Sequence, residues 1–165
     1  DLMTIREHKG SLPGLKLCFI GDGNNMANSL IVGCLKTGMK VSIACPKDYQ
    51  PDPIVLEFAK DNPDFQLTDN VLEAAKDADV LYTDVWASMG QESEKAEREK
   101  VFGGVYQVNE QLMAAANPGA MVLHCLPAHR GEEITADVFE AHPEIFDEAE
   151  NRLYAQMAVM ALLLA

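Results

Sequence analysis

The sequence predicts an α/β fold, a doubly wound three-layer αβα sandwich on a mainly parallel sheet of five strands. Short apolar runs alternate along the chain with stretches of helical periodicity, which is the pattern of βα units. The length of 165 residues suits one domain, and the hydrophobic content of 48% supplies a core. Both observations argue against a disordered chain.

The first predicted βα unit follows a Pro-Gly turn. Residues 15–20 (LKLCFI) form an apolar run that ends at a second glycine-rich turn, which predicts a strand. The apolar residues that follow have the spacing of one helix face, and Gly38 ends that helix. These residues are Ala27, Leu30, Ile31 and Cys34.

The remaining elements continue the same alternation. Strands are predicted at residues 40–45, 65–67, 80–85 and 121–125, and helices at residues 53–60, 70–76 and 109–116. Pro53 suits the first turn of a helix. By analogy with Rossmann-like folds, we expect the strands, counted along the chain, to lie in the order 3-2-1-4-5.

Both ends of the chain carry apolar helical patterns. Leu2, Met3 and Ile5 precede Gly10 as if within a helix that this glycine terminates. Residues 153–165 (LYAQMAVMALLLA) are apolar all round, and such a helix is buried on most sides. We therefore expect this chain to be part of a longer protein whose other part covers both helices.

The composition narrows the class of partner. The net charge of −13 argues against nucleic acid and anionic membrane surfaces. The longest apolar run is also too short for a membrane helix, which needs about 20 residues. The four cysteines lack paired metal-ligand spacing, and no secretory signal opens the chain, so we expect reduced thiols in the cytoplasm. We expect no cofactor and no metal.

Polar clusters follow three of the predicted strands and open the last helix. In open parallel sheets, ligands bind at the carboxyl ends of the strands, so these clusters are the candidate site. They are residues 21–25 (GDGNN), 84–90 (DVWASMG), 124–127 (HCLP) and 150–152 (ENR).

Two cofactor interpretations of these clusters have little support. The G-x-G of the first cluster is half of a dinucleotide fingerprint, but Met26 stands at the third glycine position. A tight turn that needs glycine accounts for these glycines, and one of the two asparagines could cap the next helix. A zinc site of His124, Cys125 and His129 matches no structural zinc spacing.

Two charged segments of the chain are predicted to lie at the protein surface. Residues 132–150 contain eight acids, which predicts a solvated surface. Residues 91–100 could form an exposed helix or the stem of a mobile lid, and the composition favours the helix.

Asp84 and Cys125 follow different strands, and we expect both at one sheet edge. A thiol needs a nearby cation or base to become a thiolate, and a carboxylate opposes this change. The pair therefore suits a bound ammonium group better than a hydrolase dyad. The alternative is that Cys125 is a buried core thiol.

At these clusters the sequence resembles ornithine carbamoyltransferases. Aspartate carbamoyltransferases share the fold but lack the SMG and HCLP pieces. The resemblance implies that residues 1–165 are the single ornithine-binding domain of a two-domain enzyme, without its N-terminal carbamoyl phosphate domain. The matching pieces are residues 1–7 (DLMTIRE), 21–25, 84–90, 106–108 (YQV), 124–127 and 148–152 (EAENR).

The resemblance also implies an activity and partners. The activity is transfer of the carbamoyl group of carbamoyl phosphate to the δ-amine of L-ornithine, which gives L-citrulline and phosphate in arginine metabolism. The partners are these two substrates, the N-terminal half, and further copies in a homotrimer or larger assembly. The isolated domain is expected to be inactive.

The resemblance carries over roles for individual residues. Asn25 and the backbone amide of Met89 would bind the ornithine α-carboxylate, and Asp84 and Ser88 the α-ammonium group. Cys125 would accept a proton near the δ-amine. Leu126 would offer its carbonyl there, and Arg152 would reach carbamoyl phosphate. The alternative function is a non-catalytic amino-acid-binding module of the same fold, which would not need the proton acceptor.

Overall fold

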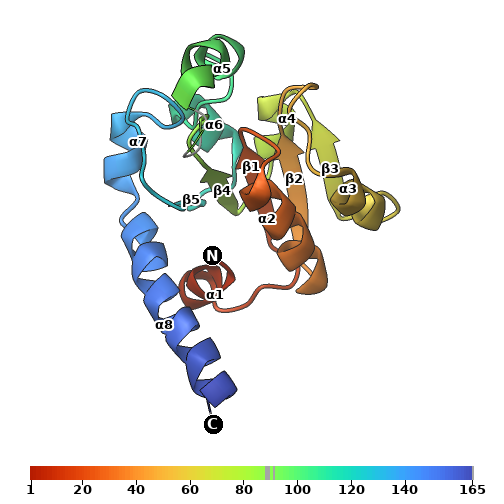
Figure 1. Cartoon of the computed structure of the whole chain (residues 1–165), viewed down its shortest axis with the longest axis vertical. Helices are drawn as coiled ribbons and strands as arrows, with labels where there is room; N and C mark the ends of the chain where they lie inside the picture. The colour runs from red at the N-terminus through yellow and green to blue at the C-terminus, as the bar shows by residue number, and fades with distance from the viewer. Residues whose placement is uncertain (88–89, 91, 165) are drawn as a thin grey trace.

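The computed structural model describes residues 1–87, 90 and 92–164, and it has the predicted α/β architecture (Figure 1). Five parallel strands form one sheet in the order β3-β2-β1-β4-β5, which confirms the predicted order. Their bounds differ slightly from the predicted runs. The strands are β1 (Lys16–Ile20), β2 (Lys40–Ala44), β3 (Phe65–Thr68), β4 (Val80–Thr83) and β5 (Met121–His124).

Helices cover both faces of this sheet. One face packs against α1 (Leu2–Lys9), α2 (Asn25–Lys36) and α3 (Pro53–Ala59). The other face packs against α4 (Val71–Ala75), α6 (Glu110–Ala115) and α7 (Ala136–Ala141). Helix α5 (Lys95–Phe102), which a 3-10 turn (Glu92–Glu94) precedes, joins the same apolar cluster through Phe102. The long helix α8 (Glu144–Leu164) begins beside β5 and runs past α1 (Figure 1).

Strands β1, β2, β4 and β5 each contribute to two apolar clusters because successive side chains point to opposite faces. In β1, Leu17 and Phe19 join the cluster under α1 and α2, whereas Cys18 and Ile20 join the cluster under α4 and α6. These four strands are therefore buried on both sides, as parallel strands usually are, whereas the edge strand β3 is only partly buried.

Helices α2, α3, α4 and α6 begin directly after a residue whose side chain caps their N-terminus. The side chains of Asn24, Asn70 and Asn109 accept hydrogen bonds from the first free backbone N–H groups of α2, α4 and α6. Asp52 caps α3, which has Pro53 in its first turn. These residue types are the preferred N-caps because their short side chains reach those N–H groups.

Two surface predictions are wrong in part. Residues 132–150 include helix α7, which we did not predict, and Glu133, Glu144 and Glu148 are buried rather than solvated. Residues 91–100 were expected to form a plain exposed helix, but Arg98 on α5 is buried. A charged run does not reveal which of its side chains meets a partner from another element.

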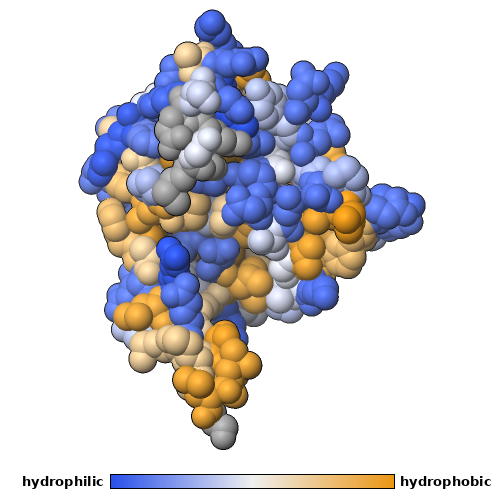
Figure 2. Space-filling view, viewed as in Figure 1, coloured by the Kyte–Doolittle hydropathy of each residue, from blue (hydrophilic) through white to orange (hydrophobic). Residues whose placement is uncertain are grey.

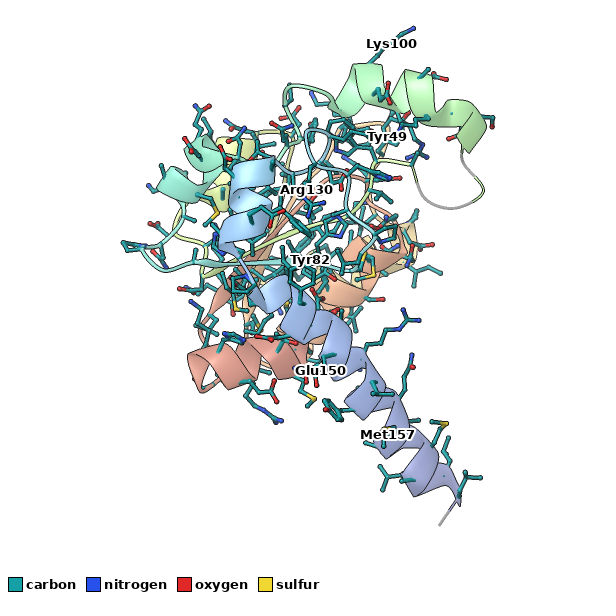
Figure 3. All side chains as sticks on the ribbon, turned by 90° about the vertical axis from the view of Figure 1, so that its left-hand side faces the viewer. Tyr49, Tyr82, Lys100, Arg130, Glu150 and Met157 are labelled. Carbon is teal, nitrogen blue, oxygen red and sulfur yellow. The ribbon has the colours of Figure 1, made fainter. Side chains whose placement is uncertain are left out.

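The second half of α8, which carries Met157, projects from the body of the molecule (Figures 1 and 3). Its apolar side chains are exposed, and Leu162, Leu163 and Leu164 keep 80–85% of their surface. In Figure 2 they form an apolar patch at this end. Among the described residues, no helix combines the length and apolarity that crossing a membrane would require.

Candidate functional site

The strand register places the polar clusters at one edge. At the carboxyl end of the sheet, Ile20 pairs with Ala44 and with Thr83, and Thr83 pairs with His124. The residues that follow β1, β4 and β5 therefore leave the sheet side by side. This is the edge at which open parallel sheets bind ligands.

Asp84 and Cys125 meet at this edge, as we expected from the sequence. Cys125 Sγ donates to Asp84 Oδ1 at 3.0 Å, and the same carboxylate oxygen accepts the backbone N–H of Val85 at 2.8 Å. Asp84 is buried, whereas Cys125 is partly exposed. A carboxylate and a thiol thus face the same point from adjacent strands.

The protonation state of Cys125 follows from its surroundings. Burial raises the pKa of this thiol, and the negative charge and hydrogen bond of Asp84 raise it further. Both effects disfavour a thiolate. In the absence of a bound cation, Cys125 is therefore a protonated donor rather than a base.

Asn24 also contacts Asp84, and this contact was not predicted from the sequence. Its Nδ2 donates to Asp84 Oδ2 at 2.9 Å, while its Oδ1 caps α2. Asn25, the residue predicted to bind the ligand, begins α2 and is exposed. The sequence indicated that one of the two asparagines caps the helix, but nothing local showed that Asn24 also holds Asp84.

Cys125 and Arg152 line one pocket of about 400 Å³. Its walls come from α1, α2, β5 and α8, and Met26 and Glu148 also line it. Arg152 is exposed on α8. The predicted proton acceptor and the predicted carbamoyl phosphate contact therefore share a hollow, with Asp84 hydrogen-bonded to Cys125.

Leu126 lies in an unusual turn directly after Cys125. Its φ is +53°, and its peptide bond to Pro127 is cis. Its N–H donates to Nδ1 of His124 at 2.9 Å, so the ring proton of that imidazole lies on Nε2, which faces Glu133 Oε1 at 3.1 Å. The buried His124–Glu133 pair thus holds the turn that presents Cys125 and Leu126.

Glu148 is a second residue that sequence reasoning missed at the site. It is buried, accepts a hydrogen bond from the Tyr82 hydroxyl at 2.8 Å, and accepts the His124 N–H at 3.0 Å. Burial is the largest cause of its raised pKa. Figure 3 places Tyr82 beneath α8, so this carboxylate ties α8 to β4 and β5.

A buried ion pair attaches α5 to the same edge. Arg98 Nη1 donates to Asp22 Oδ2 at 2.6 Å and to the Trp86 carbonyl at 3.0 Å, and its guanidinium lies over the Tyr49 ring. The segment that follows β4 is therefore held close to the turn that follows β1. Ser88 and Met89, which the resemblance places at the substrate, lie outside the described residues.

The structure disfavours both cofactor interpretations. A Cβ at Gly23 would overlap the backbone of Pro51 and Gln50, so that face of the turn is occupied by the chain itself rather than open to a pyrophosphate. This close approach, rather than a positive φ, is why Gly23 is a glycine. His124 and Cys125 group with Asp84, while His129 groups with Glu132 and Glu133, so the triad of His124, Cys125 and His129 is not assembled.

Known proteins resemble this chain over nearly its full length. Residues 13–163 match the family model described as aspartate/ornithine carbamoyltransferase, Asp/Orn binding domain. An ornithine carbamoyltransferase of Thermococcus kodakarensis is 51% identical over 99% of this chain and 54% of its own length. One from Carboxydothermus hydrogenoformans is 52% identical over the same shares. The chain spans about half the length of the curated relatives it matches.

Solved structures agree with the sequence matches. The crystal structure of an anabolic ornithine carbamoyltransferase from Campylobacter jejuni superposes with a TM-score of 0.92 at 43% identity, and the match covers 99% of this chain and 56% of that chain. The ornithine carbamoyltransferase structure from Pyrococcus furiosus superposes with a TM-score of 0.88 at 50% identity, over 97% and 53%. The whole α/β domain is therefore shared with those enzymes.

Proposed function

This chain belongs to the aspartate/ornithine carbamoyltransferase family, and we propose that it is the ornithine-binding half of an ornithine carbamoyltransferase. The δ-amine of L-ornithine attacks the carbamoyl carbon of carbamoyl phosphate, the bond from that carbon to the phosphate oxygen breaks, and the amine loses a proton. The products are L-citrulline and phosphate. The observation that carries the proposal is the hydrogen bond of Cys125 to Asp84 beside the pocket that Arg152 shares.

The electrostatics of this pair suit a diamino acid. An ammonium group that enters beside Asp84 gains a buried carboxylate partner, and its positive charge opposes the effect of Asp84 on the Cys125 thiol. The pKa of the thiol then falls when the substrate binds. In the loaded site the thiol releases its own proton to solvent, and the resulting thiolate accepts the δ-amine proton.

The remaining roles follow the resemblance. Asn25, Ser88 and Met89 contribute to the grip on the amino-acid head, and Asp84 is its anionic partner. Leu126 directs its carbonyl to the δ-amine, and Arg152 at the rim of the pocket contacts carbamoyl phosphate. Alignment of two substrates in this way contributes about 7–11 kcal/mol in favourable cases. No cofactor takes part.

A second half of the enzyme supplies the rest of the carbamoyl phosphate site. The matched relatives are about twice as long as this chain. The second half of α8 exposes a large apolar surface, and such surfaces usually mark sites where another protein segment packs. We propose that the N-terminal domain covers this surface of α8. The complete enzyme works in the cytoplasm as a homotrimer or a larger assembly.

The test measures citrulline formation by the complete protein as the ornithine concentration varies. Asp84→Ala and Cys125→Ala are expected to raise KM for ornithine and to lower kcat, while the exposed-carboxylate control Glu57→Ala leaves both unchanged. Ornithine binding by calorimetry without any turnover of the complete wild-type protein would instead identify an amino-acid-binding module. Unchanged kinetics in both site variants would refute the assigned roles.

A separate experiment tests the hypothesis that this chain is one half of a two-domain enzyme. The 165-residue chain alone is expected to form no citrulline, and addition of the missing half should restore turnover. Turnover by the chain alone would show that no second half is required.

A further inference from the structure

The turn between β5 and α7 gathers three side chains that the proposed reaction does not use as substrate contacts. His129, Glu132 and Glu133 each offer one ligand atom, and these atoms lie within 4.8 Å of one another. The turn is held from two directions. The Glu132 N–H donates to the His129 carbonyl at 3.0 Å, and Gln107 Nε2 donates to the Glu132 carbonyl at 2.7 Å.

One oxygen in this group lacks a hydrogen bond. Glu133 is fully buried, and its Oε1 accepts the His129 N–H at 2.6 Å and faces His124 Nε2 at 3.1 Å. Among the described residues its Oε2 has no hydrogen-bond partner. That oxygen lies 3.8 Å from His129 Nδ1, so it points into the cluster.

A buried carboxylate of this kind needs a positive charge. A buried charge is costly unless it is paired, and His124 is neutral because its Nδ1 accepts the Leu126 N–H. The Lys95 ammonium is bonded to Glu132 Oε1 at 2.8 Å and leaves Glu132 Oε2 facing His129. The cluster therefore keeps one nitrogen and two carboxylate oxygens for a further cation.

The distances suit a small divalent metal ion. His129 Nδ1 lies 3.8 Å from Glu133 Oε2 and 4.0 Å from Glu132 Oε2. Tetrahedral Zn²⁺ with ligand bonds of roughly 2.0–2.1 Å spaces its ligands about 3.4 Å apart. Rotation of the partly exposed His129 and Glu132 side chains toward Glu133 would close this difference. His129 is 46% exposed and Glu132 31% exposed, which leaves a route for the ion from solvent.

We propose that His129 Nδ1, Glu132 Oε2 and Glu133 Oε2 bind a divalent transition-metal ion of the zinc class, with water in the fourth position. Imidazole and carboxylate form a ligand set that zinc accepts. The ion compensates the buried Glu133 charge. Through the other oxygen of Glu133 it steadies His124, which holds the turn after Cys125. Its role is structural, and the proposal does not depend on the proposed reaction.

The experiment titrates Zn²⁺ into the complete, chelator-treated protein and measures binding by calorimetry in a buffer that does not bind metal. The wild type is expected to bind one ion at this site. His129→Ala and Glu132→Gln, both at exposed side chains, should each weaken binding by more than about 100-fold, since outer-shell partners alone contribute roughly 10–100-fold. The matched control is His8→Ala, which removes an exposed histidine paired with one carboxylate, Asp147.

A second readout separates this site from the group of Asp84, His124 and Cys125. Co²⁺ at the proposed site has only nitrogen and oxygen ligands, so its spectrum should lack a sulfur-to-cobalt charge-transfer band, and Cys125→Ser should still bind Zn²⁺. Circular dichroism verifies that each variant is folded. Absence of Zn²⁺ binding, unchanged binding in both His129→Ala and Glu132→Gln, or loss of binding in Cys125→Ser would each overturn the proposal.

Discussion

Replacement of Asn24 tests whether this side chain holds the candidate site together. Asn24→Ala removes the two bonds that cap α2 and the 2.9 Å bond to Asp84 Oδ2. Loss of an N-cap costs about 1 kcal/mol in a range of roughly 0.5–2. A hydrogen bond to a charged group contributes roughly 1.5–3 kcal/mol. We therefore expect Asn24→Ala to lower the free energy of unfolding by about 2–5 kcal/mol.

Asn24→Ser separates the two contributions. A serine hydroxyl also caps a helix, but it is too short to reach Asp84 from this position. Asn24→Ser should thus lose mainly the bond to the carboxylate and be about 1 kcal/mol more stable than Asn24→Ala. In the Asp84→Asn background the acceptor is neutral, so the cost of Asn24→Ser should fall to roughly 0.5–1.5 kcal/mol.

The assay is equilibrium unfolding of the 165-residue chain in urea, followed by circular dichroism. The four proteins of the Asn24→Ser and Asp84→Asn cycle give the coupling energy between the two positions. Additive effects, within about 0.3–0.5 kcal/mol, would show that the two side chains do not interact and would refute this reasoning.

Two further predictions concern single residues at the same edge. Gly23→Ala should destabilise the chain by about 1–3 kcal/mol or more because the new Cβ would overlap the Pro51 backbone. The control Gly33→Ala should cost less, since its Cβ would meet only the flexible side chain of Leu2. The measurement is thermal unfolding, and equal shifts of the unfolding temperature in both variants would contradict the overlap. Cys125 should react with iodoacetamide more slowly than a free cysteine, with a rate that still rises above pH 8.5, since its pKa is raised. Asp84→Asn removes the negative charge, lowers that pKa and should speed the reaction near neutral pH; an unchanged rate would exclude Asp84 as a cause of the shift.

The order and type of the main elements could be predicted because their signals are local. The apolar residues from Ala27 to Cys34 lie on one face of a helix whatever that helix packs against. The short apolar run at residues 15–20, bounded by turns, is typical of a buried strand. The candidate edge could also be predicted, since the residues that follow parallel strands leave the sheet on the same side. Helix α7 was missed because acidic residues mask its short apolar face.

The sequence by itself determined the alternating strands and helices, the capping asparagines and the polar clusters, because each depends on neighbours a few residues away. Only the tertiary structure decided which of those polar groups touch. Asn24 meets Asp84 across 60 positions of chain, and Cys125 meets Asp84 across 41. Burial of Glu133 and Glu148 was decided in the same way. Strand order and register set these contacts, and a charged side chain carries no local mark of whether water or a partner from another element will surround it.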